Sequence, residues 1–333
     1  MISADRAAKL VRAFPTQRLL VLGDVILDRY VWGRADRISP EAPVPVVQVS
    51  RESVMPGGAG NVARNVSTLT GHVELVSVIG EDPTGQDLGR LLADLKIEIG
   101  GLLADSERPT TVKTRVIARG QQVVRFDREL EEPLSPSTAA RLLGALLERV
   151  DQVDGVILQD YGKGVLSPEV LEGVMRQCSK ARVPVFVDPK AEHWELYRGA
   201  ELLKPNLREA EVVAGIRVRD ESDVRRLGER VVERTGARTV AITRGEDGIS
   251  LFYDGGGSDH VPTEVRAVAD ATGAGDTAIA TLALARLAGA SWVEAAEMAN
   301  TAAGVVVEVL GTAALGPEDL ERALARIRAK EDP

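Results

Sequence analysis

Short apolar runs without polar alternation recur along this chain, and they constrain its fold more than any other feature. The runs are rich in Val, Ile and Leu, and several precede a longer segment of helical periodicity. They cover residues 18–23, 73–80, 155–160, 183–187 and 239–243. A parallel sheet needs such strands because helices cover both of its faces. The pattern therefore predicts an α/β fold, a doubly wound sandwich around a mostly parallel central sheet.

Two stretches depart from this pattern. Residues 44–50 follow a proline-rich entry, and residues 111–127 alternate apolar and charged side chains around Arg119-Gly120, as a β-hairpin does. We expect a small antiparallel lid formed by residues 29–50 and 110–128. No repeat, low-complexity tract or linker divides the chain, so residues 1–333 are expected to form one domain with this lid.

Composition excludes several classes of protein. The 333 residues are 44% hydrophobic, enough for a large core, and the net charge of -9 argues against a general nucleic-acid partner. The single cysteine, Cys178, excludes an internal disulfide and favours a reducing compartment. The N-terminus lacks an apolar signal core, and no apolar run is long enough to span a bilayer. These features predict a cytoplasmic protein without a membrane partner.

A glycine turn carries the most chemical information. Gly273-Ala274-Gly275-Asp276 stands directly before an alanine-rich helical run that extends to Leu287. Backbone N–H groups at such a helix start stabilise anions, including the charge of a phosphoryl group in transit. Asp276 stands where it can accept a hydroxyl proton. An isolated turn of this kind is more often a simple helix cap, but the motifs below favour the catalytic interpretation.

A second glycine cluster, Gly57-Gly58-Ala59-Gly60-Asn61, opens another helical segment. Residues 58–63 match the G-x-G-x-x-A dinucleotide pattern, so a nicotinamide-dependent oxidoreductase is an alternative. That motif must follow a strand, and residues 53–56 do not suggest one. We therefore interpret the cluster as a surface that a sugar approaches closely, with Asn61 hydrogen-bonded to its hydroxyls.

Polar residues follow several predicted strands, where α/β proteins place their ligands. Candidates for the sugar side are Asp24, Asp28, Asp160 and Lys163. Candidates for a nucleotide site are Asn206, Leu207, Arg208, Glu209, Thr243, Gly245 and Gly248. The second group offers an amide, a cation, a glycine turn and, in Glu209, an acid that can hold Mg²⁺ through water. Each residue alone is more often part of a solvated turn.

Together these residues resemble the ribokinase-like (PfkB) carbohydrate kinases from Leu19 to the C-terminus. The early Gly-Gly…Asn cluster and the late Gly-Ala-Gly-Asp turn are the two hallmarks. Residues 23–30 and 37–46 resemble more narrowly the heptose 7-phosphate kinases of lipopolysaccharide core synthesis, as do residues 160–164, 188–190, 206–209 and 300–307. The resemblance implies a three-layer ribokinase-like sandwich whose β lid often joins a homodimer.

The resemblance also implies a reaction. ATP would phosphorylate C1 of D-glycero-β-D-manno-heptose 7-phosphate, with Mg²⁺ and, as a further candidate cofactor, a monovalent cation such as K⁺. Asp276 would be the base, and Asn300 would lie near the adenine. The ATP phosphates would lie at Thr243 and Gly245. The residues implied for the sugar side are Asp24, Gly57, Gly58, Asn61 and Lys163.

Alternatives remain open at this point. A kinase of another sugar or of a nucleoside fits the same motifs, and an oxidoreductase or a non-catalytic sugar sensor is a more distant alternative. Many heptose kinases carry a C-terminal nucleotidyltransferase, whereas this chain has no His-x-Gly-His motif, so a stand-alone kinase is expected. The phosphate of the substrate would require cations from the lid segments. These are Arg29, Arg34, Arg37, Lys113, Arg115, Arg119 and Arg125.

Overall fold

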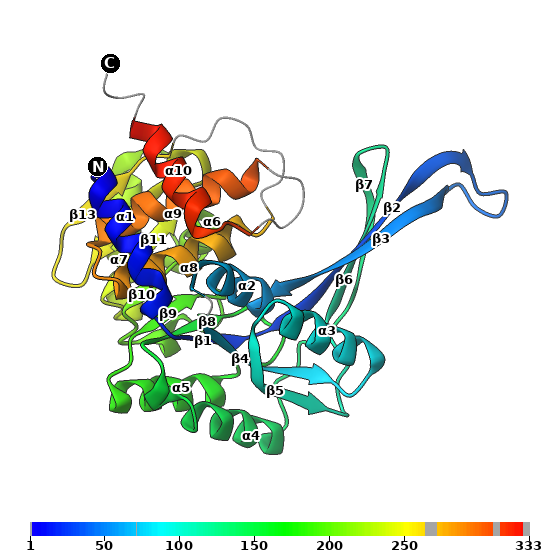
Figure 1. Ribbon diagram of the computed structural model, residues 1–333, viewed down its shortest axis with the longest axis horizontal. Helices are drawn as coiled ribbons and strands as arrows, with labels where there is room; N and C mark the ends of the chain where they lie inside the picture. The colour runs from blue at the N-terminus through cyan, green and yellow to red at the C-terminus, as the bar shows by residue number, and fades with distance from the viewer. Residues whose placement is uncertain (1, 71, 264–271, 309–313, 329–333) are drawn as a thin grey trace.

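A nine-stranded sheet forms the centre of the computed structural model, which describes residues 2–70, 72–263, 272–308 and 314–328 (Figure 1). The strand order is β13-β12-β11-β10-β9-β8-β1-β4-β5. Neighbours from β11 to β5 are parallel, and only β12 and β13 at one edge are antiparallel. The strands are β1 (Leu19–Gly23), β4 (Val73–Gly80), β5 (Glu98–Asp105), β8 (Gly155–Gln159), β9 (Val185–Asp188), β10 (Leu202–Leu203), β11 (Thr239–Thr243), β12 (Ile249–Tyr253) and β13 (Ser258–Val261).

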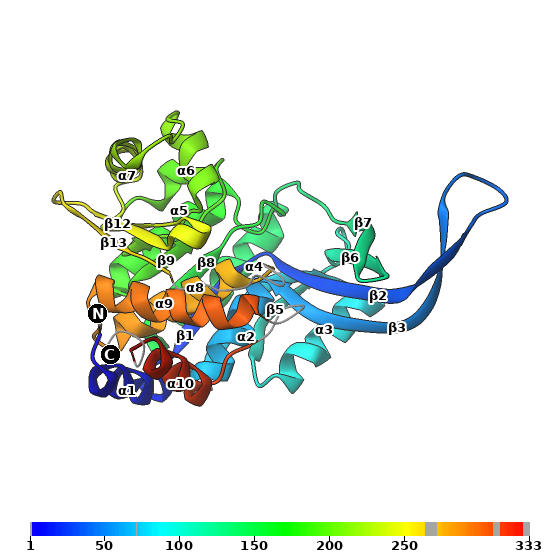
Figure 2. The same cartoon turned by 90° about the horizontal axis from the view of Figure 1, so that it is seen from above.

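Helices cover both faces of this sheet and bury two separate apolar clusters (Figure 2). The helices on the first face are α1 (Ala4–Ala13), α2 (Ala59–Thr70), α3 (Pro83–Asp94), α8 (Ala274–Leu287), α9 (Trp292–Val307) and α10 (Pro317–Arg328). Those on the second face are α4 (Pro136–Leu147), α5 (Pro168–Ala181), α6 (Leu207–Ala214) and α7 (Glu221–Thr235). Short 3-10 turns are η1 (Phe14–Thr16), η2 (Val150–Gln152), η3 (Trp194–Tyr197) and η4 (Gly245–Asp247). The predicted three-layer α/β sandwich is confirmed.

The predicted strands, β1, β4, β8, β9 and β11, all lie inside the sheet, whereas β10 between β9 and β11 and β12 beside β13 were not predicted. Every residue of β1 and β8 is buried, because helices pack on both sides of them. The edge strands β5 and β13 were not predicted, since β5 contains two glycines and β13 is largely polar and exposed. Among the described helices, none combines the length and the apolar character that a membrane crossing requires.

Strand order places a crevice at the centre of the sheet. The chain passes from β1 to β4 and β5 on one side, and then returns to β8, β9, β10 and β11 on the other. The carboxyl ends of β1 and β8 therefore lie at a topological switch point, where open α/β sheets hold their ligands. The residues that follow these two strands are Asp24 and Asp160.

The lid is a four-stranded sheet that projects from the body (Figures 1 and 2). Its strands, in the order β3-β2-β6-β7, are β2 (Val25–Ile38), β3 (Pro45–Gly58), β6 (Val112–Ala118) and β7 (Gln121–Arg128). The two hairpins are antiparallel, and the second turns at Arg119-Gly120, where both residues have positive φ. The hairpins join through a parallel pair, β2 with β6, which was not predicted because it links distant parts of the chain.

The expectation that no strand precedes the Gly57-Gly58 cluster is wrong. A strand does precede it, because β3 ends at Gly58 and α2 begins at Ala59. However, β3 belongs to the lid and runs antiparallel to β2, whereas β4 after the helix pairs with β1. The parallel strand–helix–strand unit of a dinucleotide site is therefore not formed.

Candidate active site

Asp276 lies in the first turn of α8, buried at the centre of the molecule. Gly273 occupies the N-cap with φ 85°, a left-handed conformation that glycine adopts without strain. It has no side chain to accept the first N–H groups of the helix. The open amides and the positive end of the helix dipole make this turn suited to an anion. Asp276, whose side chain lies beside this turn, is only 4% exposed.

Three side chains from different elements hold the carboxylate of Asp276. Asn61 of α2 donates from Nδ2 to Oδ2 at 2.7 Å. The Tyr161 hydroxyl donates to Oδ1 at 3.1 Å, and Gln159 Nε2 lies 3.3 Å from the same oxygen. The sequence suggested a sugar contact for Asn61, but in this structure its amide nitrogen contacts the carboxylate of Asp276.

The pKa of Asp276 is raised to about 7. Burial is the largest cause, and the negative charge of Asp188 acts in the same direction. Hydrogen bonds from Asn61 and Tyr161 and the positive charge of Lys204 oppose the rise. A carboxylate with a pKa close to neutrality suits a general base, because it is substantially ionised and can still hold a proton.

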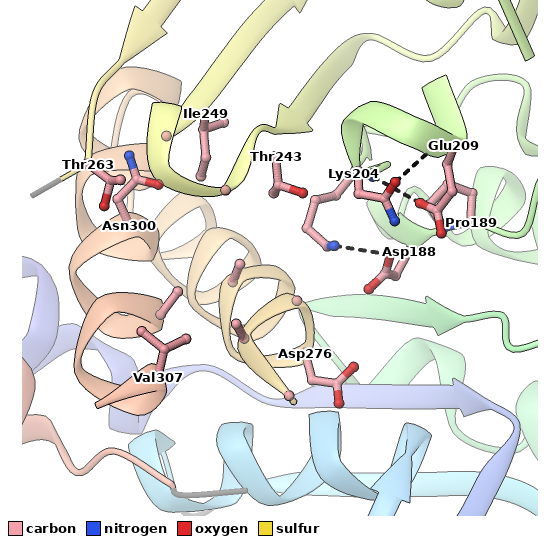
Figure 3. Close-up of a pocket in the computed structure, with 18 of the residues that line it drawn as sticks. Asp188, Pro189, Lys204, Glu209, Thr243, Ile249, Thr263, Asp276, Asn300 and Val307 are labelled. Atoms are coloured by element: carbon pink, nitrogen blue, oxygen red, sulfur yellow. Dashed lines mark hydrogen bonds and ion pairs between the residues drawn. The ribbon is translucent and has the colours of Figure 1, made fainter. Parts of the chain in front are cut away.

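A cavity of about 650 Å³ opens from Asp276 across the carboxyl ends of β8, β9 and β11 (Figure 3). The catalytic turn lines it with all four residues, Gly273, Ala274, Gly275 and Asp276. Of the predicted nucleotide residues, those that also line it are Asn206, Glu209, Thr243, Gly245, Gly248 and Asn300. Leu207 and Arg208 are not among the lining residues; Leu207 packs against the apolar cluster beneath α6. The cavity thus joins segments that are far apart in the sequence.

Local hydrogen bonds shape the wall of this cavity. Asn206 is the N-cap of α6, and its side chain and that of Glu209 bond to each other's backbone N–H at 2.9 Å. This capping box gives Asn206 and Glu209 a structural role at the start of α6. Asn300 of α9 donates to the carbonyls of Val261 and Pro262, at 2.9 and 3.2 Å, and ties α9 to the end of β13.

One buried cation lies between the catalytic turn and the strand ends. Lys204, 3% exposed, pairs with Asp188 at 3.1 Å, and both line the cavity. A cation here can pair with phosphate oxygens when a nucleotide enters. The described residues contain no cluster of three or more His, Cys, Asp or Glu arranged to bind a metal. A hydrated Mg²⁺ needs only one or two carboxylates besides phosphate oxygens, so Glu209 at the cavity wall fits that requirement.

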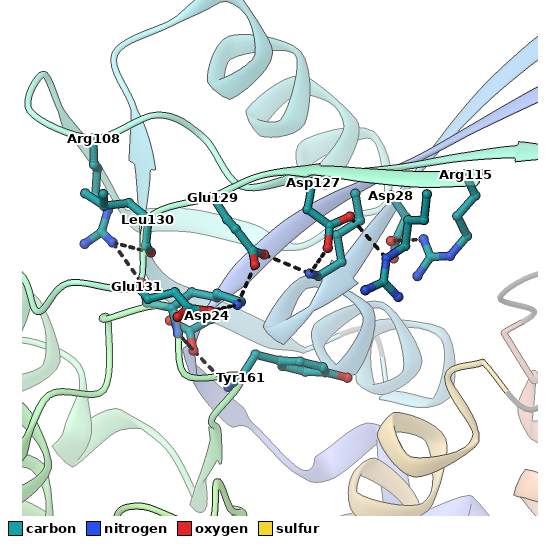
Figure 4. Close-up of polar contacts among 12 residues, drawn as sticks. Asp24, Asp28, Arg108, Arg115, Asp127, Glu129, Leu130, Glu131 and Tyr161 are labelled. Carbon is teal, nitrogen blue, oxygen red and sulfur yellow. Dashed lines mark hydrogen bonds and ion pairs between the residues drawn. The ribbon is translucent and has the colours of Figure 1, made fainter. Parts of the chain in front are cut away.

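The predicted sugar-side residues are engaged in contacts within the chain (Figure 4). Asp24 accepts three backbone N–H groups of residues 161–165. Asp28 pairs with Arg115 of the lid. Lys163 pairs with Glu129 at 2.7 Å and with Glu131 at 2.6 Å.

Asp160, Gly57 and Gly58 also make contacts within the chain that give them structural roles. Asp160 lines the cavity but accepts hydrogen bonds from the Tyr197 hydroxyl and the Gly162 N–H. A Cβ on Gly57 would lie 2.2 Å from Asp28 Oδ2, and one on Gly58 would lie 2.3 Å from the Asp24 carbonyl oxygen. The glycines therefore let the end of β3 approach β2 closely.

Several lid cations are already paired in this structure. The pairs are Lys113 with Asp127 and Glu129, Arg115 with Asp28, Arg119 with Asp36, and Arg125 with Asp127. A substrate phosphate that approached these cations would meet carboxylates beside them. Contact of the phosphate with the lid stays a prediction.

Sequence reasoning missed two residues that contact the Asp276 carboxylate, Gln159 and Tyr161. Both stand at the end of β8, a position that was marked as functional only through its neighbour Asp160. Their role depends on contact with α8, more than a hundred residues later in the chain. The strand end was therefore a usable signal, but the identity of the contacting side chains was not.

Comparison with known proteins agrees with this geometry. The model of a family described as "pfkB family carbohydrate kinase" matches residues 16–319. The chain belongs to this family. The expected carbohydrate kinase is thereby confirmed, and the oxidoreductase alternative loses its support.

Curated relatives share much of the sequence. The chain is 44% identical over 301 residues to the bifunctional protein HldE of Geobacter metallireducens, and the match covers 90% of this chain and 61% of the relative. The HldE protein of Geobacter sulfurreducens matches with the same identity and coverage. The chain thus spans about three fifths of the length of these relatives.

Solved structures of lower identity share the fold. A ribokinase of Arabidopsis thaliana complexed with ribose and ATP has a TM-score of 0.73 at 21% identity, covering 92% of this chain and 98% of its own. Phosphofructokinase-2 of Escherichia coli in complex with potassium has a TM-score of 0.77 at 21% identity, covering 94% and 99%. The ribokinase-like fold expected from the sequence is therefore confirmed.

Proposed function

We propose that this carbohydrate kinase transfers the γ-phosphoryl group of ATP to the C1 hydroxyl of D-glycero-β-D-manno-heptose 7-phosphate, in the synthesis of the lipopolysaccharide core. The observation that carries the proposal is the 44% identity to HldE proteins over 301 residues, against 21% to a ribokinase. Residues 23–30 and 37–46, which resemble heptose 7-phosphate kinases, support it further. Kinases of other sugars or of nucleosides share the catalytic turn and remain the second candidate.

The chemistry follows from the position of Asp276. Its carboxylate accepts the proton of the attacking hydroxyl while the hydroxyl oxygen forms a bond to the γ-phosphorus. The bond from that phosphorus to the bridging oxygen breaks, and ADP leaves with the electron pair. The amides at the start of α8 and the ammonium of Lys204 stabilise charge on the transferred group.

The cavity wall supplies the nucleotide site in this proposal. Asn206, Thr243, Gly245, Gly248 and Asn300 line the space in which ATP would lie. Glu209 would hold Mg²⁺ through water, and the ion would neutralise phosphate charge. Leu207 and Arg208 would act only by supporting that wall. Dependence on a monovalent cation such as K⁺ stays a prediction, as does a cytoplasmic location.

The sugar would lie at the switch point between the catalytic turn and the lid. Asp28, Gly57, Gly58, Asn61 and Lys163 border this region through their contacts with Asp276, the lid or residues 161–165. Asp24 and Asp160 would act there through the segment that they hold. The lid would close on the sugar, and two copies of the chain would pair through it.

An acceptor panel tests the proposal. ADP release from Mg-ATP is measured with heptose 7-phosphate, ribose and fructose 6-phosphate in parallel. We expect kcat/KM for the heptose to exceed that for the other sugars by at least about 100-fold, because a site built for a phosphate and several hydroxyls discriminates strongly. Preferred turnover of another sugar would contradict heptose 7-phosphate as the substrate but would leave the proposed mechanism intact.

A further inference from the structure

The two oxygens of the base carry different numbers of hydrogen bonds. Oδ1 accepts from the Tyr161 hydroxyl and from Gln159 Nε2, at 3.1 and 3.3 Å, whereas among the residues that the structure describes only Asn61 Nδ2 donates to Oδ2. A carboxylate oxygen has two lone pairs in the carboxylate plane. Both acceptor positions of Oδ1 are therefore used, and one position on Oδ2 remains free to receive a proton.

Tyr161 is placed by a carboxylate that lies on another strand. Asp24 directly follows β1, and its Oδ2 accepts the backbone N–H of Tyr161 at 2.8 Å and that of Lys163 at 3.1 Å. Its Oδ1 accepts the N–H of Val165 at 3.1 Å. Asp24 is 1% exposed, so these bonds are shielded from water (Figure 4). The segment 161–165 is thereby fixed across the switch point.

Among the described residues, the hydrogen bonds to the Asp24 carboxylate all come from this segment. Its carboxylate makes no ion pair within the part of the chain that the structure describes, and backbone amides take the place of a cation. The ionisable groups that act on it are Asp160, Arg108, His193 and Tyr197. Those that act on Asp276 are Asp188, Lys204 and Tyr161. A buried carboxylate without an ion pair costs stability even when backbone amides satisfy it, which indicates a use beyond packing.

We propose that Asp24 is a positioning residue for the catalytic base: by holding residues 161–165, it keeps the Tyr161 hydroxyl donating to Oδ1 of Asp276 and leaves Oδ2 to receive the proton of the attacking hydroxyl. This rests on the proposed kinase function. In that step the proton moves to Oδ2, the hydroxyl oxygen bonds to phosphorus, and ADP departs with the electron pair of the broken bond.

The proposal is tested first without any substrate. Aspartate labelled with ¹³C at Cγ is incorporated, the Asp276 resonance is assigned by its loss in Asp276→Asn, and the free protein is titrated. Tyr161→Phe removes a donor that favours the ionised carboxylate, so the Asp276 midpoint should move to higher pH, making Asp276 roughly a tenfold weaker acid. The group is titrated without sugar or nucleotide, so the result does not depend on which sugar is the substrate.

Asp24→Asn distinguishes positioning from a simple charge effect. Removal of a nearby negative charge alone would move the Asp276 midpoint to lower pH. Loss of the Tyr161 contact moves it to higher pH, which is the result we expect. The double variant with Tyr161→Phe should then show no further upward movement, because both changes remove the same hydrogen bond.

A matched control is another buried aspartate at the end of a strand. Asp105 is the last residue of β5, and its carboxylate accepts from the backbone N–H of Glu107 at 2.9 Å and from the Thr138 hydroxyl at 3.0 Å, not from residues 161–165. Asp105→Asn should leave the Asp276 midpoint unchanged even if stability falls. An Asp24→Asn protein that loses stability but keeps the wild-type midpoint would overturn the proposal.

If Asp24→Asn does not fold, Tyr161→Phe decides alone. An unchanged Asp276 midpoint in that variant would overturn the role of the tyrosine and with it that of Asp24. With the sugar that the wild type phosphorylates, Tyr161→Phe should also lower kcat/KM about tenfold below pH 7 and leave the KM for ATP unchanged. Failure of the acceptor panel together with a moved midpoint would reject the proposed substrate and retain the positioning role.

Discussion

At the scale of single residues, the site depends on one carboxylate kept in a buried, mostly neutral surrounding. Asp276 lies at a helix start that favours its ionised form, while burial and Asp188 oppose ionisation. The balance gives a pKa of about 7. The same group can therefore hold and release a proton within the physiological range.

The pH dependence of catalysis follows from this value. Because the base must be ionised, kcat/KM should rise tenfold for each pH unit below about pH 7 and become level above it. Initial rates over pH 5.5–9, with saturating Mg²⁺ at each pH, measure this limb. A limb centred near pH 4, the ordinary range of an aspartate, would contradict the buried base.

The same ionisation acts on stability in the opposite direction. The folded-state pKa of Asp276 lies above the unfolded value, so the folded protein binds this proton more tightly. The contribution of Asp276 to the free energy of unfolding is therefore largest below about pH 4 and falls as pH rises toward 7. Asp24, whose pKa burial and Asp160 raise to about 6, acts in the same direction.

Sequence reasoning pointed to Asp276 as the candidate base but not to the residues around it. Gly273, Gly275 and Asp276 are adjacent, so a short motif reveals them. Tyr161 and Gln159 reach Asp276 only because β8 and α8 pack together, which no local pattern records. Asp24 was found at its strand end, but whether its carboxylate faced a ligand or the chain itself depended on residues 161–165.

At the scale of elements, the catalytic turn and the β3–α2 junction use glycine for different reasons. A Cβ on Gly275 would lie 3.6 Å from Lys204 Nζ, an ordinary contact, and the residue is exposed at the cavity. A Cβ on Gly58 would lie 2.3 Å from a backbone oxygen, and φ is +56°. Gly275 leaves open space beside the cavity, and Gly58 permits the left-handed backbone conformation and the close approach to Asp24.

Alanine substitutions separate these two uses. Gly275→Ala should lower kcat at least about tenfold, because the methyl group enters the space beside the amides that hold the phosphoryl group. Its free energy of unfolding should stay within about 0.5 kcal/mol of wild type. Gly58→Ala should lose about 2 kcal/mol or more from strain and overlap. Urea unfolding and ADP release measure both variants; a destabilised but fully active Gly275→Ala would contradict the account.

Element boundaries were predictable where packing is uniform. The central strands β1 and β8 are buried on both faces, and their apolar runs predict them. The lid was predicted from alternation and a two-residue turn, but the parallel β2–β6 pair was not, since its register depends on contacts between residues 27–33 and 112–118. Strand pairing at a distance is set by the whole fold.

At the scale of the whole molecule, the lid leaves apolar side chains uncovered. Most of the exposed large hydrophobic residues in the described chain belong to it or to its β2–β3 loop, namely Ile38, Val44, Val49, Val54, Val123, Val124 and Phe126. Exposed apolar side chains gathered on a projecting sheet are typical of an interaction surface. They support the proposed pairing of two copies through their lids.

Oligomeric state tests this pairing. Phe126→Asp places a charge in the contact on both copies and should raise the dimer dissociation constant at least about 100-fold. Val212→Asp on α6 is the control, because Val212 is at least as exposed as Phe126 but lies outside the lid. Sedimentation velocity over a concentration series measures both variants. A dimer that survives Phe126→Asp unchanged would place the interface elsewhere.

The most direct test of the account concerns Asp276 itself. Asp276→Asn keeps the size of the side chain and removes the base. We expect kcat for sugar phosphorylation to fall at least about 1,000-fold, while the dissociation constant for ATP, measured by calorimetry, changes less than about threefold. Residual turnover within about tenfold of wild type, with ATP binding intact, would contradict the assignment of Asp276 as the base.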